Sequence, residues 1–292
     1  MGQRQYLDYH CNGVLLRIAR ELIIQKLHGQ EQVLKKFFQH SSASFQVIAE
    51  ARRVVARANN KEEIRRWEAK GALAYWSAMR EVPVNFSKDD SAKIPEHWKR
   101  FGSRVSPLTN SPRLAVNLAN AILNYLYTVL ESESRLALAA LGLDPGIGVL
   151  HNDLRSRDSL ASDLMEPVRP KVDALLLKLL TSEELRREWF FEQRDGNCRL
   201  MASFAVKLSE TAIMWRTAVA SFAEWIAKCF WDSRIRPMRS VAPATRLTQR
   251  QRSEGRTKLS GLDEAISARL SLCRICGQVR KVANGVCREC VG

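Results

Sequence analysis

The chain has 292 residues, of which 46 are Lys or Arg and 31 are Asp or Glu, so its formal net charge is +15. With 46% hydrophobic and 26% charged residues it can bury a core, which excludes wholesale disorder and a fibrous repeat. It has no apolar run near the roughly 18 residues that span a membrane and no secretory signal at its start, so we expect a soluble cytoplasmic protein. The positive charge suits a polyanion such as nucleic acid, although a merely basic soluble protein explains it equally well.

The first half of the chain predicts a series of amphipathic helices. Apolar residues recur at helical spacing over residues 14–38 and again over residues 45–58. A third helix is expected to begin after Asn60, because Asn60 followed by Glu63 has the form of an N-cap and its acidic partner. Residues 81–112 hold four prolines and no sustained period, so they predict a long loop or lid.

Further helices and turns follow in the second half. The apolar pattern of residues 114–141 predicts one helix or a pair, and the glycines and proline of residues 142–148 then force a turn. A helical pattern resumes near Leu164, and Pro167 and Pro170 must lie in its first turns or kink it.

Three features close this part of the chain. Residues 181–184 look like a fresh N-cap, residues 194–197 favour a hairpin turn, and residues 200–230 predict one long helix. We therefore expect residues 1–231 to form a mainly α, multi-helix domain.

The composition changes after this domain. Residues 232–261 are rich in arginine and small polar residues and predict a basic linker. Residues 262–292 hold two Cys-x-x-Cys pairs, the ligand set of a tetrahedral structural Zn²⁺ site: Cys273, Cys276, Cys287 and Cys290. They predict a small zinc ribbon, with four unrelated thiols as the less favoured alternative. Four thiolates leave no open position, so catalysis at this zinc is not expected.

Four polar residues are candidates for a site in the helical part. Glu68 lies on an apolar helix face, where a carboxylate needs a cation, either a metal ion or a neighbouring basic residue. His151 follows the turn and two apolar residues, which suits either a ligand or a hydrogen-bonded core histidine. Asp163 and Glu166 are spaced i, i+3, which suits one shared face or a capping box.

Taken in order, several motifs closely resemble the CRISPR-associated spacer-acquisition integrase family. They are EAKGALAYW at residues 68–76, NAILNYLY at 120–127, GLDPGIGVLH at 142–151, DSL at 158–160 and DLMEPVRP at 163–170. The similarity covers about residues 1–230, and several ordered motifs are far more specific than any single one.

The resemblance implies a helical catalytic domain in which a glutamate, a histidine and a further acid bind a divalent metal. Carried over position by position, these are Glu68, His151 and Glu166, with Asp163 beside them. Oxygen ligands with one imidazole suit Mg²⁺ or Mn²⁺. The implied reaction is transesterification, in which the 3′-OH of a short DNA duplex attacks a target phosphodiester, so no protein nucleophile is required. The implied partners are double-stranded DNA and further copies of the chain, as a homodimer or higher oligomer, in a prokaryotic cytoplasm.

Two departures from the family pattern bear on assembly. The family usually begins with a β-rich domain that meets a small companion protein, and that domain is expected to be absent here. A zinc ribbon is not a general feature of the family either, so the companion is in doubt. Two alternatives stay open: a casposase, the transposon-encoded relative, and a catalytically silent DNA-binding zinc-ribbon protein. The intact set of Glu68, His151 and Glu166 argues against the second.

Overall fold

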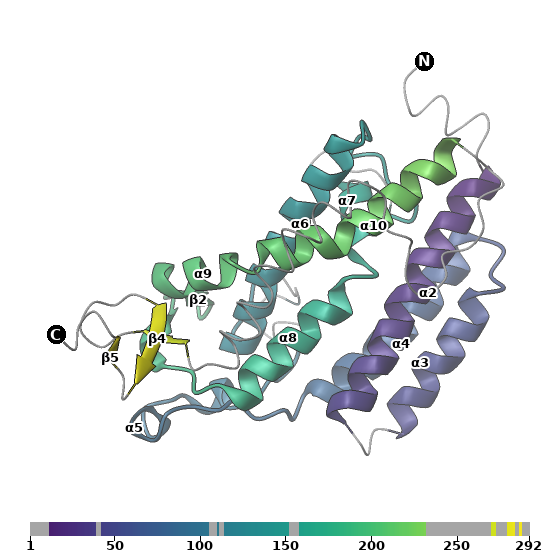
Figure 1. Ribbon diagram of the computed structural model, residues 1–292. Coiled ribbons are helices and arrows are strands. Elements are labelled where there is room, and N and C mark those ends of the chain that lie inside the picture. Colours follow the sequence, from purple (N-terminus) through teal and green to yellow (C-terminus); the bar gives the residue numbers. More distant parts are fainter. Residues whose placement is uncertain are drawn as a thin grey trace. The chain divides into compact units, whose positions relative to one another are not determined.

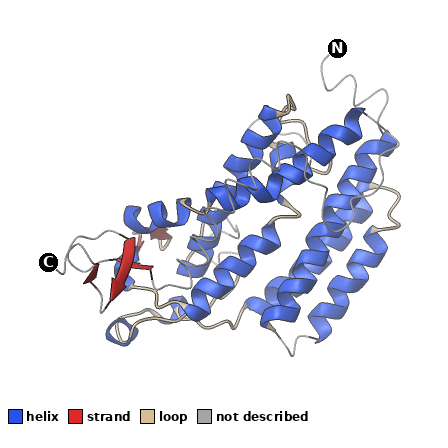
Figure 2. Cartoon of the chain, viewed as in Figure 1, coloured by secondary structure: helices blue, strands red, loops and turns tan. Residues whose placement is uncertain are grey.

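The computed structural model describes the following residues: 12–38, 42–104, 110, 114–151, 158–231, 270–272, 279–283 and 286–287. The chain divides into two units, Met1–Ala242 and Pro243–Gly292. The described part of the first unit is mainly helical (Figure 1, Figure 2), as the apolar spacing predicted. Among the described helices, none is both long enough and apolar enough to cross a membrane.

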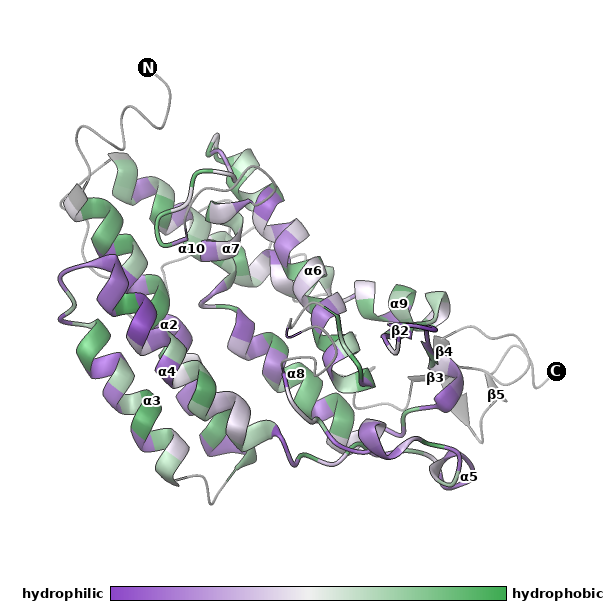
Figure 3. Cartoon of the chain, turned by 180° about the vertical axis from the view of Figure 1, so that it is seen from behind, coloured by the Kyte–Doolittle hydropathy of each residue, from purple (hydrophilic) through white to green (hydrophobic). Residues whose placement is uncertain are grey.

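Three long helices of the first unit lie side by side (Figure 1): α2 (Asn12–Phe37), α3 (Ser42–Val55) and α4 (Lys61–Met79). They confirm the three helices expected in the first half of the chain. Hydrophobic and hydrophilic residues alternate along α3 (Figure 3), as in an amphipathic helix with one buried face. The three helices pack against one another through such faces.

Two sequence details explain where α4 begins and how closely it packs. The side chain of Asn60 accepts a hydrogen bond of 2.8 Å from the backbone N of Glu63, which confirms the predicted cap. A Cβ atom at Gly71 would lie 2.8 Å from Cδ2 of Leu27, so glycine lets α4 lie this close to α2 without a shift of the Leu27 side chain. Glu68 lies one turn before Gly71, and this contact therefore brings Glu68 against α2.

A second group of helices packs around α6 (Leu118–Ala140), and three of its members also contact α2. It comprises α6 itself, α7 (Ser159–Met165), α8 (Arg169–Ser182), α9 (Ala202–Ser209) and α10 (Ala212–Trp231). The helix α6 packs against α7, α8 and α10, while α2 packs against α7, α8 and α10 as well. The region around α2, α7 and α8 is consequently shared by both groups, and it carries the candidate site.

Two predictions about helix ends are wrong. Residues 200–230 form two helices because Thr211 interrupts the run: its hydroxyl donates to Leu208 O at 2.7 Å and accepts from Trp215 Nε1 at 2.8 Å. Residues 181–184 start no new helix, since Thr181 belongs to α8 and its hydroxyl donates back to Leu177 O.

The segments between the helices are short or irregular. The predicted hairpin is confirmed: β1 (Phe190–Glu192) pairs antiparallel with β2 (Cys198–Leu200), and Gly196 in its turn has φ +78. In the described residues of the predicted loop 81–112, the only helical elements are α5 (Lys88–Ser91) and the 3₁₀ turn η1 (Glu96–Trp98). A further 3₁₀ turn, η2 (Arg187–Trp189), precedes β1.

The described part of the second unit is a small antiparallel sheet in the order β3-β4-β5: β3 (Leu270–Leu272), β4 (Val279–Ala283) and β5 (Val286–Cys287). Cys287 contributes its backbone to β5. The other three cysteines of the predicted zinc site, Cys273, Cys276 and Cys290, lie outside the described residues, as does the basic linker. The zinc ribbon therefore stays a prediction.

Candidate metal centre

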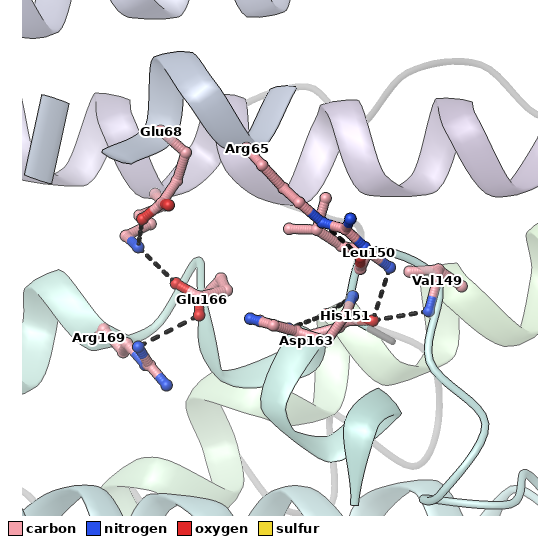
Figure 4. Close-up of polar contacts among 9 residues, drawn as sticks. Arg65, Glu68, Val149, Leu150, His151, Asp163, Glu166 and Arg169 are labelled. Carbon is pink, nitrogen blue, oxygen red and sulfur yellow. Dashed lines mark hydrogen bonds and ion pairs between the residues drawn. The ribbon is translucent and has the colours of Figure 1, made fainter. Parts of the chain in front are cut away.

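Two of the predicted site residues, Glu68 and Glu166, face one another from different parts of the fold (Figure 4). Glu68 lies on α4, and Glu166 caps the C-terminal end of α7. The ammonium of Lys26 on α2 lies between them, 2.7 Å from Glu166 Oε2 and in short contact with Glu68 Oε1. The side chains of Lys26 and Glu166 are only 8% and 4% exposed, while that of Glu68 is 23% exposed. The cluster is therefore accessible to solvent mainly at Glu68.

A second cation, Arg169 at the start of α8, contacts the other oxygen of Glu166. Its Nη1 lies 3.2 Å from Glu166 Oε1 (Figure 4). Burial favours the neutral carboxyl, but Arg169 and Lys26 outweigh burial and lower the pKa of Glu166 to about 2. Burial likewise opposes the charge of Lys26, yet Glu166 and Glu68 raise its pKa. Glu166 and Lys26 are thus both charged at neutral pH.

Asp163 orients His151. Its carboxylate is fully buried in α7, with Oδ1 2.5 Å from Nδ1 of His151. It also accepts hydrogen bonds from the backbone N of Val149, Leu150 and His151, at 2.6, 2.9 and 3.2 Å. Because Nδ1 faces Asp163, Nε2 is the ring nitrogen left to meet a ligand. The His151 ring extends toward Glu166 in Figure 4, and its charge when protonated contributes to lowering the pKa of Glu166.

These contacts contradict the capping-box alternative for Asp163 and Glu166. The residue at the N-cap of α7 is Asp158, and Asp163 lies inside the helix. The i, i+3 spacing instead sends Asp163 to the loop before α7 and Glu166 to the ion-pair cluster.

The loop that carries His151 is held by a tight turn at Gly148 and by hydrogen bonds from Arg65 and to Asp163. A Cβ atom at Gly148 would lie 2.6 Å from the carbonyl O of His151 and 2.7 Å from Cβ of Ser159, so this tight turn requires glycine. Arg65 of α4 donates to the carbonyl O of Leu150, with its Nε at 3.1 Å. The loop is thereby tied to α7 by Asp163 and to α4 by Arg65.

A buried polar network lies behind Arg169. Asp173 of α8 accepts hydrogen bonds from the hydroxyls of Tyr127, at 2.6 Å, and Tyr75, at 3.0 Å. The guanidinium of Arg169 lies 5.1 Å from the centroid of the Tyr127 ring, a cation–π distance. Arg169 is therefore held on two sides, by the Tyr127 ring and by Glu166.

With this geometry in place, comparison with known proteins identifies the family. The family model for CRISPR associated protein Cas1 matches residues 1–211. The chain belongs to the Cas1 family.

Individual Cas1 relatives cover a similar part of the chain. It is 32% identical over 217 residues to CRISPR-associated endonuclease Cas1 1 of Archaeoglobus fulgidus, covering 68% of this chain and 59% of the relative. It is 32% identical over 205 residues to CRISPR-associated endonuclease Cas1 2 of Rhodospirillum rubrum, covering 65% of this chain and 55% of that protein. The chain thus spans somewhat more than half the length of these two relatives.

Solved structures share the fold at lower identity. A Cas1 protein from Thermotoga maritima matches with a TM-score of 0.60 and 21% identity, over 77% of this chain and 68% of that one. A casposase bound to integration product matches with a TM-score of 0.59 and 22% identity, over 78% and 68% of the two chains. These similarities establish a Cas1-like fold for the helical unit.

The side chains of Glu68, Glu166 and His151 are of the types that bind a divalent ion, but in this structure the two carboxylates contact the ammonium of Lys26. The described residues contain no group of three His, Cys, Asp or Glu side chains that could hold a metal ion as they stand. The donor types nevertheless suit Mg²⁺ or Mn²⁺, since the carboxylates of Glu68 and Glu166 already share one cation and His151 offers Nε2 nearby. The assignment of Glu68, His151 and Glu166 as ligands stays a prediction.

Sequence reasoning about this Cas1-family site missed Lys26, Arg169 and Asp173. Lys26 follows Leu22 by four residues on the buried face of α2, so a lysine on an apolar face was a readable sign of a buried partner. Asp173 precedes the buried Leu176 and Leu177 by three and four residues and carries the same sign on α8. Arg169 lies within a recognised motif, but nothing in its spacing points to Glu166 rather than to solvent.

The stability of this Cas1-family fold should depend on the protonation of Asp173. Burial raises the pKa of Asp173 to about 6, against the hydroxyl donors and the two nearby arginines. That value exceeds the unfolded value of about 3.9, so the folded state binds more protons and loses stability as pH rises from about 4 to 6. Asn at position 173 cannot ionise, so Asp173→Asn does not lose this stability. As pH rises from 4 to 7, the difference in free energy of unfolding between the variant and wild type should therefore shift in favour of the variant by up to about 3 kcal/mol. Urea unfolding at both pH values measures this, and parallel pH profiles for the two proteins would contradict it.

Proposed function

We propose that the chain is a divalent-metal-dependent DNA integrase that joins the 3′-OH of a short DNA duplex to a target phosphodiester, as in CRISPR spacer acquisition. The observation that carries the proposal is the convergence of Glu68 and Glu166 on one cation position beside an oriented His151, in a member of the Cas1 family. The Archaeoglobus and Rhodospirillum relatives are both called endonucleases, and the casposase was solved bound to an integration product, which supports phosphodiester chemistry.

Each residue of the cluster has a distinct part in this proposal. Asp163 keeps the proton of His151 on Nδ1 and so leaves Nε2 available as a ligand. Glu68 and His151, whose side chains are 23% and 25% exposed, form the accessible edge at which a phosphate can arrive. Arg169 keeps Glu166 ionised within the fold. A divalent ion bound by these ligands would stabilise the charge that develops on the phosphoryl oxygens and on the leaving 3′ oxygen.

A strand-transfer assay tests the function. Purified protein is mixed with a labelled duplex and a supercoiled plasmid, with Mn²⁺, with Mg²⁺ or with EDTA. We expect label to be joined covalently to the plasmid with either metal ion. No joining is expected with EDTA, or with a duplex that ends in a 3′-dideoxynucleotide. Plasmid nicking that proceeds equally well without the 3′-OH would indicate a simple endonuclease instead.

A transposon-type integrase would perform the same strand transfer on different DNA. The casposase that shares this fold motivates a target comparison within the same assay. A plasmid that carries a CRISPR repeat array should be joined at the repeat boundary if the chain acquires spacers. Joining that ignores the array and prefers the terminal sequences of a mobile element would favour the casposase alternative.

Assembly is part of the proposal. Two solved structures with the same fold are named as complexes of a Cas1-containing protein with Cas2. We propose that this chain acts as a homodimer or higher oligomer and, when a small companion protein is present, together with it. Light scattering of the purified chain, with and without DNA, measures the number of copies.

The cysteine-rich tail is proposed to bind one Zn²⁺ and to add DNA affinity. Its four cysteines are the ligand set of a structural site, and the linker before it is strongly basic. We expect a chain that ends near Trp231 to lose one equivalent of zinc, to stay folded and to bind DNA more weakly. The slope of log K against log salt should become shallower by about one unit for each DNA phosphate that the tail neutralises in the full chain. Unchanged affinity and slope would instead make the tail an assembly element.

A further inference from the structure

Lys26 contacts both proposed carboxylate ligands. Its ammonium pairs with Glu68 on α4 and with Glu166 at the end of α7, and so joins three segments of the first unit. Its side chain is 8% exposed, and a lysine is retained at such a depth only when its charge is paired. Lys26 thus occupies the position that a metal ion bridging the two carboxylates would take.

The two cations beside Glu166 are held differently. Arg169 contacts Oε1 of Glu166, and its guanidinium lies against the Tyr127 ring, whose hydroxyl donates a hydrogen bond to Asp173. Lys26 is a flexible side chain whose ammonium is placed by the two glutamates themselves. An ion that binds Glu68 and Glu166 can therefore displace Lys26 while Arg169 keeps its contact with Oε1 of Glu166.

We propose that the ammonium of Lys26 substitutes for the metal ion. It holds Glu68 and Glu166 together before a divalent ion binds, and the divalent ion displaces it. This inference rests on the proposed metal site and adds a positioning residue to it. Without Lys26 the two carboxylates would repel one another and Glu166 would lose one of its two counter-ions. With Lys26 present, every ion that binds must first break two ion pairs, so the lysine lowers the affinity for the metal.

The test compares Lys26→Met and Lys26→Gln with the wild-type chain, all dialysed free of Mg²⁺ and Mn²⁺. Mn²⁺ binding is followed by calorimetry, and the melting temperature is measured with and without Mn²⁺. Binding that disappears in Glu68→Gln is assigned to this site. The matched control is Arg216→Gln, which removes the partner of the buried Glu133 at the contact of α10 with α6.

Removal of Lys26 should have opposite effects without and with metal. Without Mn²⁺, the Lys26 variants should melt at least about 5 °C below wild type. They should bind Mn²⁺ about tenfold or more tightly than wild type, and saturating Mn²⁺ should restore most of the difference in melting temperature. Arg216→Gln should also melt earlier, but its affinity for Mn²⁺ should equal that of wild type.

The outcomes separate this inference from the proposed function. If both Lys26 variants bind Mn²⁺ no more tightly than wild type, Lys26 is not a competitor of the metal, and the inference is wrong while the metal site stands. If neither wild type nor the variants bind Mn²⁺ in a way that depends on Glu68, the proposed metal site and the inference both fail. Lys26→Gln keeps a polar, uncharged end on a side chain one atom shorter than lysine, so it provides the comparison if Lys26→Met does not fold.

Discussion

Glu68→Ala, His151→Ala and Glu166→Ala should each reduce strand transfer by at least about 100-fold to 1,000-fold in Mn²⁺. Each substitution removes one of the three proposed ligands, and the site then fails to stabilise the charge that develops during phosphoryl transfer. The rate is measured as label joined to the plasmid in single-turnover reactions. Full metal-dependent activity in any two of the three variants would contradict the ligand assignment.

Control variants separate this loss from a folding defect. Glu62→Ala removes an exposed acid from the same helix as Glu68 and should leave the rate unchanged. Of the three ligand variants, Glu166→Ala changes the most deeply buried position and leaves Lys26 and Arg169 without their shared partner. Its melting temperature must therefore be measured beside its rate, whereas Glu68→Ala and His151→Ala alter partly exposed side chains.

Asp163→Asn should lower strand transfer by about 10-fold to 100-fold without abolishing it. The amide has one acceptor oxygen, whereas the carboxylate of Asp163 meets three backbone N–H groups and Nδ1 of His151. If the amide NH₂ turns toward His151, it favours the tautomer with the proton on Nε2, which removes the lone pair proposed for the metal. Both the rate and the affinity for Mn²⁺ should therefore fall.

The matched control for Asp163 is Asp158→Asn at the N-cap of the same helix. The carboxylate of Asp158 pairs with Arg135 of α6, so its replacement weakens α7 at one end without changing the imidazole of His151. We expect a lower melting temperature with an unchanged affinity for Mn²⁺. An equal fall in metal affinity in both variants would mean that Asp163 acts only through the stability of α7.

Local patterns predicted most of the helices because each depends on residues close in sequence. The cap of α4 required only Asn60 and Glu63, and the hairpin required only the polar turn of residues 194–197. The single helix expected over residues 200–230 was wrong because periodicity persists across Thr211, where side-chain hydrogen bonds interrupt the backbone ladder. The zinc ribbon and the linker fall on residues outside those that the structure describes.

The candidate site could be predicted only in part, since its contacts join residues far apart in the chain. An acid on an apolar face at Glu68 correctly indicated a cation, but the sequence left open whether a metal or a basic side chain supplies it. The structure places Lys26, 42 residues earlier, in that position. The spacing of Asp163 and Glu166 suggested a shared role, yet one turn of helix and its cap direct them to His151 and to Lys26, respectively.

Crystals of the chain grown with Mn²⁺ and measured at a wavelength where manganese scatters anomalously test the central claim most directly. We expect one anomalous peak bound by oxygens of Glu68 and Glu166 and by Nε2 of His151, with the ammonium of Lys26 withdrawn from between the carboxylates. Arg169 should keep its contact with Oε1 of Glu166, and Asp163 should keep its hydrogen bond with Nδ1 of His151. A peak bound directly by Asp163 with Glu166 turned away, or Lys26 still bridging Glu68 and Glu166 at saturating Mn²⁺, would contradict the account.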